Sequence, residues 1–443
     1  MHDAPSDRWD LQDVQSFLEV AEHTTAAADT GVLKGADAEP DGRQLPLCDL
    51  QRLVDGGLAQ LLVSMNPGDQ GRLWPSNCFG QTTDPCNVYD GAAGVIPLLT
   101  LAARHEGDTR LLEALRAACE WIERRLPAEP RLLPGLYFGR SGTAWALYEA
   151  AQVLKDEEMG ARALELAKRL PVTWPNPDVT HGAAGAGLAQ LHLWEATGDP
   201  ELGQRVQRCA NGLVAAAVHE RSGIGWPIPG SFDSRLAGNT YYGFAHGVAG
   251  IGWFLLAVGL ATDRDDCLTL ARAAGETLCA SAQLDEHGAT WGGGPHDEES
   301  RMVHWCHGSS GVGTFLIRLW QATGEEHVRV LAEKAAVAVR RGRWQAPPGF
   351  CHGLAGDGEY LLDLAQMLDE PSYRAWAEEL AAIIFARRAD REGRAVVPDE
   401  TGMDVTANFG LGLAGVVAFL WRLCHGGPRM WMADRVAVKG AAP

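Results

Sequence analysis

Signals for export and membrane insertion are absent from this 443-residue chain. Its first residues, Met1–Pro5, are polar and acidic, and they lack the basic start and the apolar run of a secretory signal. No uncharged apolar stretch reaches the length of a membrane span. We therefore expect a soluble protein that resides in the cytoplasm.

Basic residues are the minority among the charged side chains. The chain has 38 Lys and Arg against 57 Asp and Glu, which gives a formal net charge of −19. With no Lys/Arg run to offset this excess, nucleic-acid binding is excluded as a function class. The apolar fraction of 46% is ordinary for a globular protein, so global disorder is excluded as well.

Closely spaced cysteine pairs are also missing. None of the ten cysteines forms a Cys-x-x-Cys motif, which argues against a zinc finger. In a reducing cytoplasm, each cysteine is either a small buried apolar residue or a metal ligand or nucleophile. Core packing is the better interpretation for most of them.

Glycine, in contrast, is abundant at 52 residues, and much of it is periodic. A Gly-x-x-Gly pair recurs seven times at a spacing typical of helix-pair repeats, each time before an apolar run. The pairs are Gly91/Gly94, Gly139/Gly142, Gly182/Gly185, Gly247/Gly250, Gly308/Gly311, Gly353/Gly356 and Gly412/Gly415.

Each repeat unit has the same internal plan. An apolar helix such as 250–261 is followed by a polar turn and then by an amphipathic helix such as 108–126. Strand signals are sparse. We predict an all-α fold, an α/α toroid of seven helical hairpins with a buried inner layer and a half-exposed outer layer. An open solenoid is the alternative, but closure buries the terminal units without special polar caps.

The segments at the two ends are expected to lie outside this repeat. We assign residues 1–65 to an N-terminal linker with leading helices at Gln12–Glu22 and Leu50–Met65, and Gly35–Arg43 is the most linker-like part. Residues 66–432 form the toroid domain, and residues 433–443 form a C-terminal tail. The glycine loops should converge at one end of the ring, at the N-termini of the inner helices.

Residues with metal-binding chemistry share one register of the repeat. The position before each first glycine holds Asp90, Phe138, His181, His246, His307, His352 and Leu411. One position earlier, adjacent units carry Cys306 and Cys351. Two thiolates and one imidazole would form a three-ligand zinc site whose fourth position stays open, as in catalytic zinc sites.

Both cysteines could also be small apolar loop residues without a chemical role. Their duplication in one register favours metal binding instead. Cys424-His425-Gly426 has the same letters but follows an inner helix, so we interpret it as a helix end with Gly426 as the C-cap.

The motifs Trp305-Cys306-His307-Gly308 and Cys351-His352-Gly353, set on seven glycine pairs, resemble the lanthionine synthetase C-like (LanC-like) cyclases. The resemblance covers roughly Asp90 to Arg422. It implies an α/α toroid with one Zn²⁺ held by Cys306, Cys351 and His352. It also implies a catalytic His246, in the fourth unit, and a catalytic Asp178, four residues before the third unit's glycine.

The resemblance also implies an activity, which is addition of peptide Cys thiols to dehydroalanine or dehydrobutyrine to form thioether rings. Metal coordination deprotonates a thiol, and a histidine has a suitable pKa to protonate the α-carbon afterwards. We expect His246 to be that acid and Asp178 to orient it. His181 and His307 are second-tier candidates.

Two positions depart from the family pattern. The Arg that classical bacterial members carry four residues before the first zinc Cys is Met302 here, with Arg301 one residue away. The residue after that Cys is often Tyr, but here it is His307. Both departures concern substrate binding rather than the metal.

The expected partner is a dehydrated precursor peptide with its leader. The segment from Leu73 to Val88 resembles the cyclase part of synthetases fused to a kinase-like domain, so kinase or lyase domains of the same synthetase are further expected partners. The kinase signature motifs themselves are absent from this sequence.

Three other functions remain open from the sequence. A prenyltransferase-like zinc toroid would need a basic diphosphate pocket, for which no Lys/Arg cluster is evident. A toroid glycosidase would need paired carboxylates, for which Asp90 and Asp178 are available, but the Cys/His loops would then be unexplained. A zinc-containing peptide- or thiol-binding module without turnover is the non-enzymatic alternative.

Overall fold

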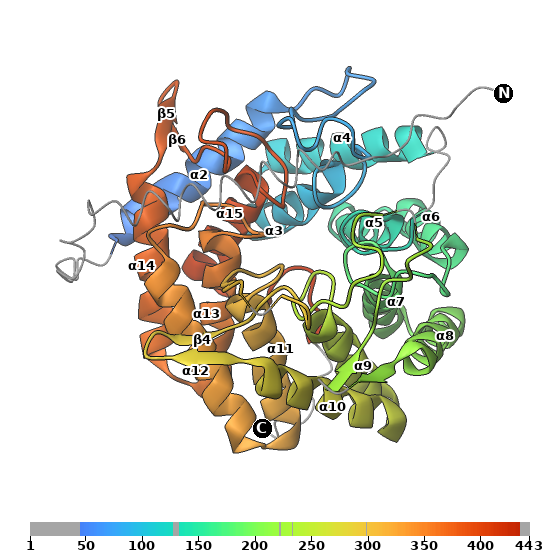
Figure 1. The fold of residues 1–443 in the computed structure, drawn as a ribbon. Helices are drawn as coiled ribbons and strands as arrows, with labels where there is room; N and C mark the ends of the chain where they lie inside the picture. Colours follow the sequence, from blue (N-terminus) through green and yellow to red (C-terminus); the bar gives the residue numbers. More distant parts are fainter. Residues whose placement is uncertain (1–44, 127–132, 221–222, 233, 298, 435–443) are drawn as a thin grey trace.

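The computed structural model describes residues 45–126, 133–220, 223–232, 234–297 and 299–434. Within these residues, helices form two concentric layers around one axis (Figure 1). The leading helix expected at Gln12–Glu22 and the linker expected at Gly35–Arg43 lie outside the described residues. The predicted all-α toroid is confirmed.

The inner layer of the described chain consists of seven helices, each of which begins within a few residues of the first glycine of a pair. They are α3 (Ile96–Glu106), α5 (Arg140–Leu154), α7 (Ala183–Thr197), α9 (Val248–Thr262), α11 (Ser309–Thr323), α13 (Leu354–Leu368) and α15 (Leu413–His425). Each packs against the next, and α15 contacts α3, so the inner ring is closed. The inner helices are apolar nearly all round because neighbours cover them on every side. In α9, for example, every residue from Val248 to Gly259 is buried.

The outer layer is amphipathic, with one buried face on each helix. It contains α4 (Thr109–Arg125), α6 (Glu157–Arg169), α8 (Pro200–Ala216), α10 (Asp265–Ser281), α12 (Glu326–Gly342) and α14 (Pro371–Ala386). Side chains of Asp108, Asp156, Asp199 and Glu370 accept backbone N–H groups at the starts of four of these helices. Such caps satisfy donors that have no partner within the helix, so they define where the outer helices begin.

The ring is closed by a helix from the N-terminal side of the repeat. Helix α2 (Leu47–Ser64) packs against α15 and so completes the seventh pair. A Cβ on Gly56 would lie 2.1 Å from the carbonyl oxygen of Ala395, so this close approach requires glycine. The helix expected at Leu50–Met65 is therefore present, but the expectation that residues 1–65 lie outside the repeat is wrong for α2.

Three short antiparallel hairpins follow outer helices. They are β1 (Val218–Glu220) with β2 (Gly223–Gly225), β3 (Gln283–Asp285) with β4 (Gly288–Thr290), and β5 (Ala389–Arg391) with β6 (Arg394–Val396). Trp226 and Trp291, which directly follow two of the hairpins, donate from Nε1 to the carbonyls of Leu213 and Leu278, each at 2.8 Å. These bonds hold the segments that follow the hairpins against the outer helices α8 and α10.

The residues after α15 enter the interior of the ring. Trp431 is 3% exposed, and its ring lies 5.6 Å from that of Trp145 on α5. Asp434 forms an ion pair with Arg318 of α11 at 2.7 Å. Ala433 is buried as well, so the predicted tail boundary at 433 is wrong for Ala433 and Asp434. Residues 435–443 lie outside the described part.

A closed cycle of backbone hydrogen bonds joins the seven glycine loops. The residue two positions before each first glycine donates its N–H to the carbonyl of its counterpart in the next unit, at 2.9–3.2 Å. The order is Tyr89, Tyr137, Thr180, Ala245, Cys306, Cys351, Gly410 and back to Tyr89. The glycines make room for this cycle, since a Cβ on Gly311 would lie 1.9 Å from the carbonyl oxygen of Trp305. Equivalent loop residues are thus held at one level of the ring.

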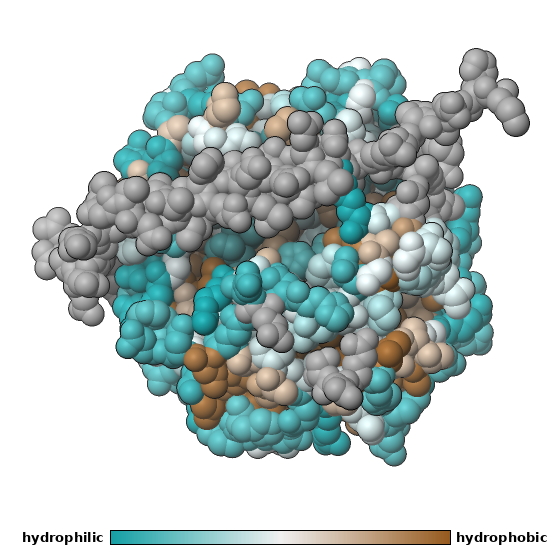
Figure 2. All heavy atoms as spheres, viewed as in Figure 1, coloured by the Kyte–Doolittle hydropathy of each residue, from teal (hydrophilic) through white to brown (hydrophobic). Residues whose placement is uncertain are grey.

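The face seen in Figure 1 is mainly hydrophilic at its rim, with small apolar patches among the loops (Figure 2). Among the described residues, the helices are too short or too polar to cross a lipid bilayer.

Candidate metal centre and active site

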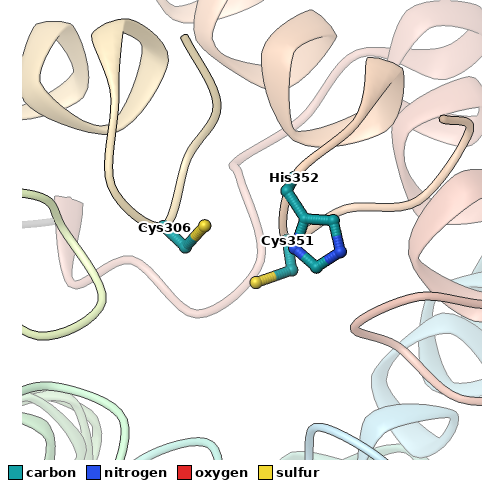
Figure 3. Close-up of side chains that lie close together, drawn as sticks. All are labelled: Cys306, Cys351 and His352. Atoms are coloured by element: carbon teal, nitrogen blue, oxygen red, sulfur yellow. The ribbon is translucent and has the colours of Figure 1, made fainter. Parts of the chain in front are cut away.

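Two neighbouring loops bring three soft or borderline donors together. Cys306 lies in the loop before α11, and Cys351 and His352 lie in the loop before α13. One donor atom from each of the three side chains lies within 4.8 Å of the other two. Figure 3 shows the two sulfurs facing the same space, with the imidazole of His352 beside Cys351. The backbone cycle sets this spacing, because the N–H of Cys306 donates to the carbonyl of Cys351 at 3.1 Å.

The chemistry of this donor set fits a zinc ion. Bond lengths of about 2.0–2.3 Å in a tetrahedral zinc site place its donors roughly 3.5–3.8 Å apart, which is compatible with the observed cluster. A hydrogen bond with Cys306, together with burial, raises the pKa of the Cys351 thiol well above its usual value. A cation beside the two sulfurs would be needed for the buried Cys351 to be present as a thiolate next to the partly buried Cys306. Three protein ligands would leave one coordination position for a substrate atom.

An acidic residue outside the sequence motifs contacts the third donor. Oε2 of Glu400 lies 2.5 Å from Nε2 of His352, and the two side chains are 7% and 14% exposed. Burial alone would lower the pKa of His352, but Glu400 and Cys351 outweigh it and raise this pKa to about 10. The contact occupies one imidazole nitrogen and leaves Nδ1 for a metal.

A second cluster forms around Asp178, whose side chain is fully buried. Its Oδ2 lies 2.7 Å from Nδ1 of His246 and 3.4 Å from Nδ1 of His181. Asn176 donates to the same oxygen at 3.1 Å. The hydroxyl of Thr180 lies 2.9 Å from Nδ1 of His246 and 2.8 Å from Nδ1 of His181. One carboxylate thus serves two imidazoles.

The electrostatics of this cluster favour the ionised carboxylate. Burial alone would raise the pKa of Asp178, but hydrogen bonds and charge from His181 and His246 outweigh burial and lower it. A buried carboxylate that accepts the Nδ1–H of His246 fixes the tautomer of that imidazole. Nε2 of His246 is then the atom that can exchange a proton with a substrate.

A row of aromatic rings connects the two clusters. The ring of His181 stacks on Phe138 at 4.6 Å and on His246 at 5.4 Å, and His246 lies 5.4 Å from His307. His307 directly follows Cys306 in the chain. Burial lowers the pKa of His307 to about 3, with the neighbouring His246 and His352 adding to the effect. The metal centre and the Asp178 cluster therefore form one continuous site on adjacent loops.

Other sequence candidates lie apart from this cluster or contact it only at its edge. Arg301 turns to the surface, where Nη1 lies 3.2 Å from Oδ2 of Asp285 in β3. Cys424 lies near the C-terminal end of α15, as predicted for the Cys424-His425-Gly426 motif, and Gly426 is the C-cap of this helix. Asp90 is buried, at 5% exposure, next to Arg72, and does not belong to the Asp178 cluster.

Two residues of the site were not predicted from the sequence. Thr180 occupies the same repeat position as Cys306 and Cys351, so that register was a usable signal. Glu400 lies in the turn after β6, outside the repeat register, and no sequence signal indicated it.

Comparisons with known proteins identify the family and the fold. A family model described as lanthionine synthetase C-like protein matches residues 82–433. The structure of nisin cyclase is similar with a TM-score of 0.62 and 16% identity, covering 88% of this chain and 96% of that one. The Lin0763 protein of Listeria innocua gives a TM-score of 0.51 and 10% identity, covering 85% and 96%. At such identities, both likenesses show the shared fold.

A curated relative matches over a shorter stretch. Glutathione S-transferase LANCL1 of Danio rerio is 33% identical over 84 residues, which cover 19% of this chain and 20% of that protein. This match thus spans about a fifth of the relative. The family model, in contrast, covers most of the chain and includes both cysteine loops and the Asp178 cluster. This chain belongs to the lanthionine synthetase C-like family.

Proposed function

We propose that this protein is a zinc-dependent cyclase that adds cysteine thiols of a peptide to dehydroalanine or dehydrobutyrine, forming lanthionine or methyllanthionine rings. The observation that carries this proposal is the continuity of two clusters on adjacent loops. Cys306, Cys351 and His352 offer a three-donor site, and His246 contacts the ring of His307, which directly follows Cys306 in the chain. Thiol addition needs both a thiolate and a proton donor.

Cys306, Cys351 and His352 would hold one zinc ion per chain. When bound, the ion supplies charge that favours the thiolate form of a substrate cysteine at neutral pH. The chain's own contribution is to present two sulfurs and one imidazole at fixed spacing, and the closed backbone cycle provides that rigidity.

His246 would act as the proton donor. The thiolate sulfur forms a bond to the β-carbon of the dehydro residue, and the double-bond electrons move towards the α-carbon and its carbonyl. Nε2 of His246 then donates a proton to the α-carbon, so the proton removed from the thiol is replaced there. Asp178 accepts from Nδ1 of His246 and stabilises the imidazolium form.

The substrate and partners follow from this activity. We propose a dehydrated precursor peptide with its leader as the substrate, and kinase or lyase domains of the same synthetase as further partners. We place the protein in the cytoplasm and assign its catalytic part to residues 66–432, and the family model over 82–433 supports most of that span.

Ring closure on a dehydrated peptide tests the proposal directly. The reaction does not change the peptide mass, but a closed ring hides its thiol from an alkylating reagent, so alkylation followed by mass spectrometry counts the rings. Zinc-loaded protein should close rings faster than the spontaneous reaction. A rate equal to the spontaneous one would leave the non-catalytic zinc-containing peptide- or thiol-binding module as the better description.

A second candidate is addition of a small thiol instead of a peptide cysteine. The relative from Danio rerio is named a glutathione S-transferase, which supports glutathione as the thiol. A dehydrated peptide without cysteines separates the two functions. Glutathione adducts on that peptide would indicate the transferase, and their absence, together with ring closure on the cysteine-containing peptide, would indicate the cyclase.

A further inference from the structure

A turn far from the cysteine loops in sequence contacts the proposed metal centre. Glu400 lies between β6 and α15, and its carboxylate reaches Nε2 of His352 at 2.5 Å. Within the described chain, Glu400 does not belong to the cluster formed by the donor atoms of Cys306, Cys351 and His352. Its contact with the site is therefore made through His352.

The turn that carries Glu400 is fixed by its neighbour Asp399, which is 1% exposed. Oδ1 of Asp399 accepts the backbone N–H of Thr401 at 3.0 Å, and Oδ2 accepts the hydroxyl of Thr406 at 3.1 Å and the amide of Asn77 at 3.3 Å. The N–H of Asp399 also donates to the carbonyl of Asp404 at 2.7 Å, which closes the turn. The hydrogen bonds of Asp399 thus fix the backbone that carries Glu400.

The chemistry of imidazole gives this contact a consequence. A neutral histidine has one N–H and one lone pair, and a carboxylate can accept only from the N–H. When His352 gives up a proton to bind a metal, Glu400 on Nε2 leaves the lone pair on Nδ1, which is then the atom that a metal would bind. A carboxylate on the distal nitrogen also makes the imidazole a stronger donor and fixes its ring orientation.

We propose that Glu400 is a positioning residue of the metal centre, which holds Nε2 of His352 and so keeps Nδ1 directed at the space between the sulfurs of Cys306 and Cys351. This inference rests on the zinc site of the proposed function. It adds a residue from outside both cysteine loops, and it makes zinc affinity depend on the turn after β6.

A matched pair of variants tests the proposal. Glu400→Gln and Asp404→Asn each remove one negative charge from the same turn without changing the size of the side chain. Asp404 pairs with the exposed Arg391 at 2.7 Å, far less buried than Glu400. Zinc affinity is measured by competition with a chromophoric chelator, and the melting temperature of the zinc-free proteins reports their folding.

Glu400→Gln should weaken zinc binding by about 10- to 100-fold, the usual effect of losing a carboxylate behind a metal-bound histidine. Asp404→Asn should bind zinc like the wild type, and the zinc-free proteins should melt alike, since a merely structural role would instead lower the melting temperature. Wild-type affinity in Glu400→Gln, or an equal loss in Asp404→Asn, would overturn the proposal.

If zinc-free Glu400→Gln is less stable than the wild type, Glu400→Asp decides the question. Aspartate keeps the charge but is one carbon too short to reach Nε2, so a similar loss of zinc affinity supports positioning, and wild-type affinity refutes it. The assay needs no cyclisation. If the wild type binds zinc but does not close rings, only the proposed function is refuted. If the wild type binds no zinc, both the proposed function and the positioning role of Glu400 are refuted.

Discussion

Oδ2 of Asp178 lies 2.7 Å from Nδ1 of His246, while Oδ1 of the same carboxylate accepts the backbone N–H of His181 at 2.7 Å. The second bond is a feature of the repeat. Asn87 and Asn408 occupy the equivalent position, four residues before the first glycine, and their Oδ1 atoms accept the N–H groups of Asp90 and Leu411. One oxygen of Asp178 therefore shapes the loop, and the other makes the contact with His246.

This division makes Asp178→Asn an informative variant. Asparagine already supports the same loop in two other units, so the variant should fold and retain zinc. Its amide nitrogen cannot accept the Nδ1–H of His246, so ring closure should slow, although less than in His246→Ala. Alkylation and mass spectrometry give the rate, and circular dichroism checks the fold. An unchanged rate would show that Oδ2 has no part in the chemistry.

His246→Ala should retain zinc and still bind the dehydrated peptide, because His246 lies outside the donor group of Cys306, Cys351 and His352. Ring closure should slow by roughly 10²- to 10⁴-fold after the spontaneous reaction is subtracted, the usual contribution of a general acid. Loss of zinc in this variant would mean that His246 is a ligand or a structural support. A wild-type rate would transfer the acid role to His307 or His181.

Cys351→Ala should lose zinc, whereas Cys424→Ala should keep one zinc per chain and full activity. Cys351 lies in the donor cluster, and Cys424 lies at the far end of an inner helix. Elemental analysis of both purified variants gives the answer. Undiminished zinc in Cys351→Ala would remove it from the ligand set, and zinc loss in Cys424→Ala would contradict the repeat register.

The parts of the fold that repeat were predictable, because each glycine pair marks the same junction between a loop and an inner helix. The register also predicted which cysteines and histidines would meet, since the backbone cycle joins identical positions. Helix α2 and the segment after α15 were placed wrongly. Their contacts with α15, α5 and α11 are long-range, and neither segment carries the periodic signal that identified the other units.

The same limit applies to the site. Glu400 reaches His352 from a turn that no repeat position specifies, and only the folded ring brings the two together. The register of the two cysteines could have indicated Thr180, but the contacts of its hydroxyl with Asp178 and His246 follow only from the folded structure.

Asp90→Asn should stabilise the protein at alkaline pH. Burial raises the pKa of Asp90 to about 7, despite the opposing charge of Arg72, whereas an unfolded Asp has a pKa of about 3.9. Between these values the folded state binds more protons, so wild-type stability falls as pH rises from about 4 to about 7. A shift of about 3 units corresponds to at most about 4 kcal/mol.

Urea unfolding at pH 5 and pH 8 checks this prediction for Asp90. The stability difference between Asp90→Asn and the wild type should grow with pH across that interval and level off above it. A difference that is the same at both values would mean that the carboxyl of Asp90 does not titrate in this window.

Asp363→Ala should be strongly destabilising, because this buried carboxylate holds three arginines in the interior of the ring. Oδ2 lies 2.9 Å from Arg318 and 2.8 Å from Arg429, and Oδ1 lies 2.8 Å from Arg422. Burial would raise the pKa of Asp363, but the arginines outweigh it and lower it. Removing the carboxylate leaves buried positive charge that Asp434 and Glu359 compensate only in part, which costs about 3–5 kcal/mol.

The surface pair of Glu123 and Arg162, at 2.7 Å, provides the control for Asp363. Glu123→Ala should cost less than about 1 kcal/mol, because solvent screens exposed ion pairs. Chemical unfolding of both variants gives the comparison. The sign of the pH effect is a further check: a lowered pKa stabilises the fold above the unfolded value of about 3.9, and that stabilisation is lost as pH falls below it. Asp363→Ala should therefore lack part of the wild type's acid sensitivity. Equal losses in the two variants would mean that neighbouring carboxylates, such as Glu359 beside Arg422, already neutralise the arginines.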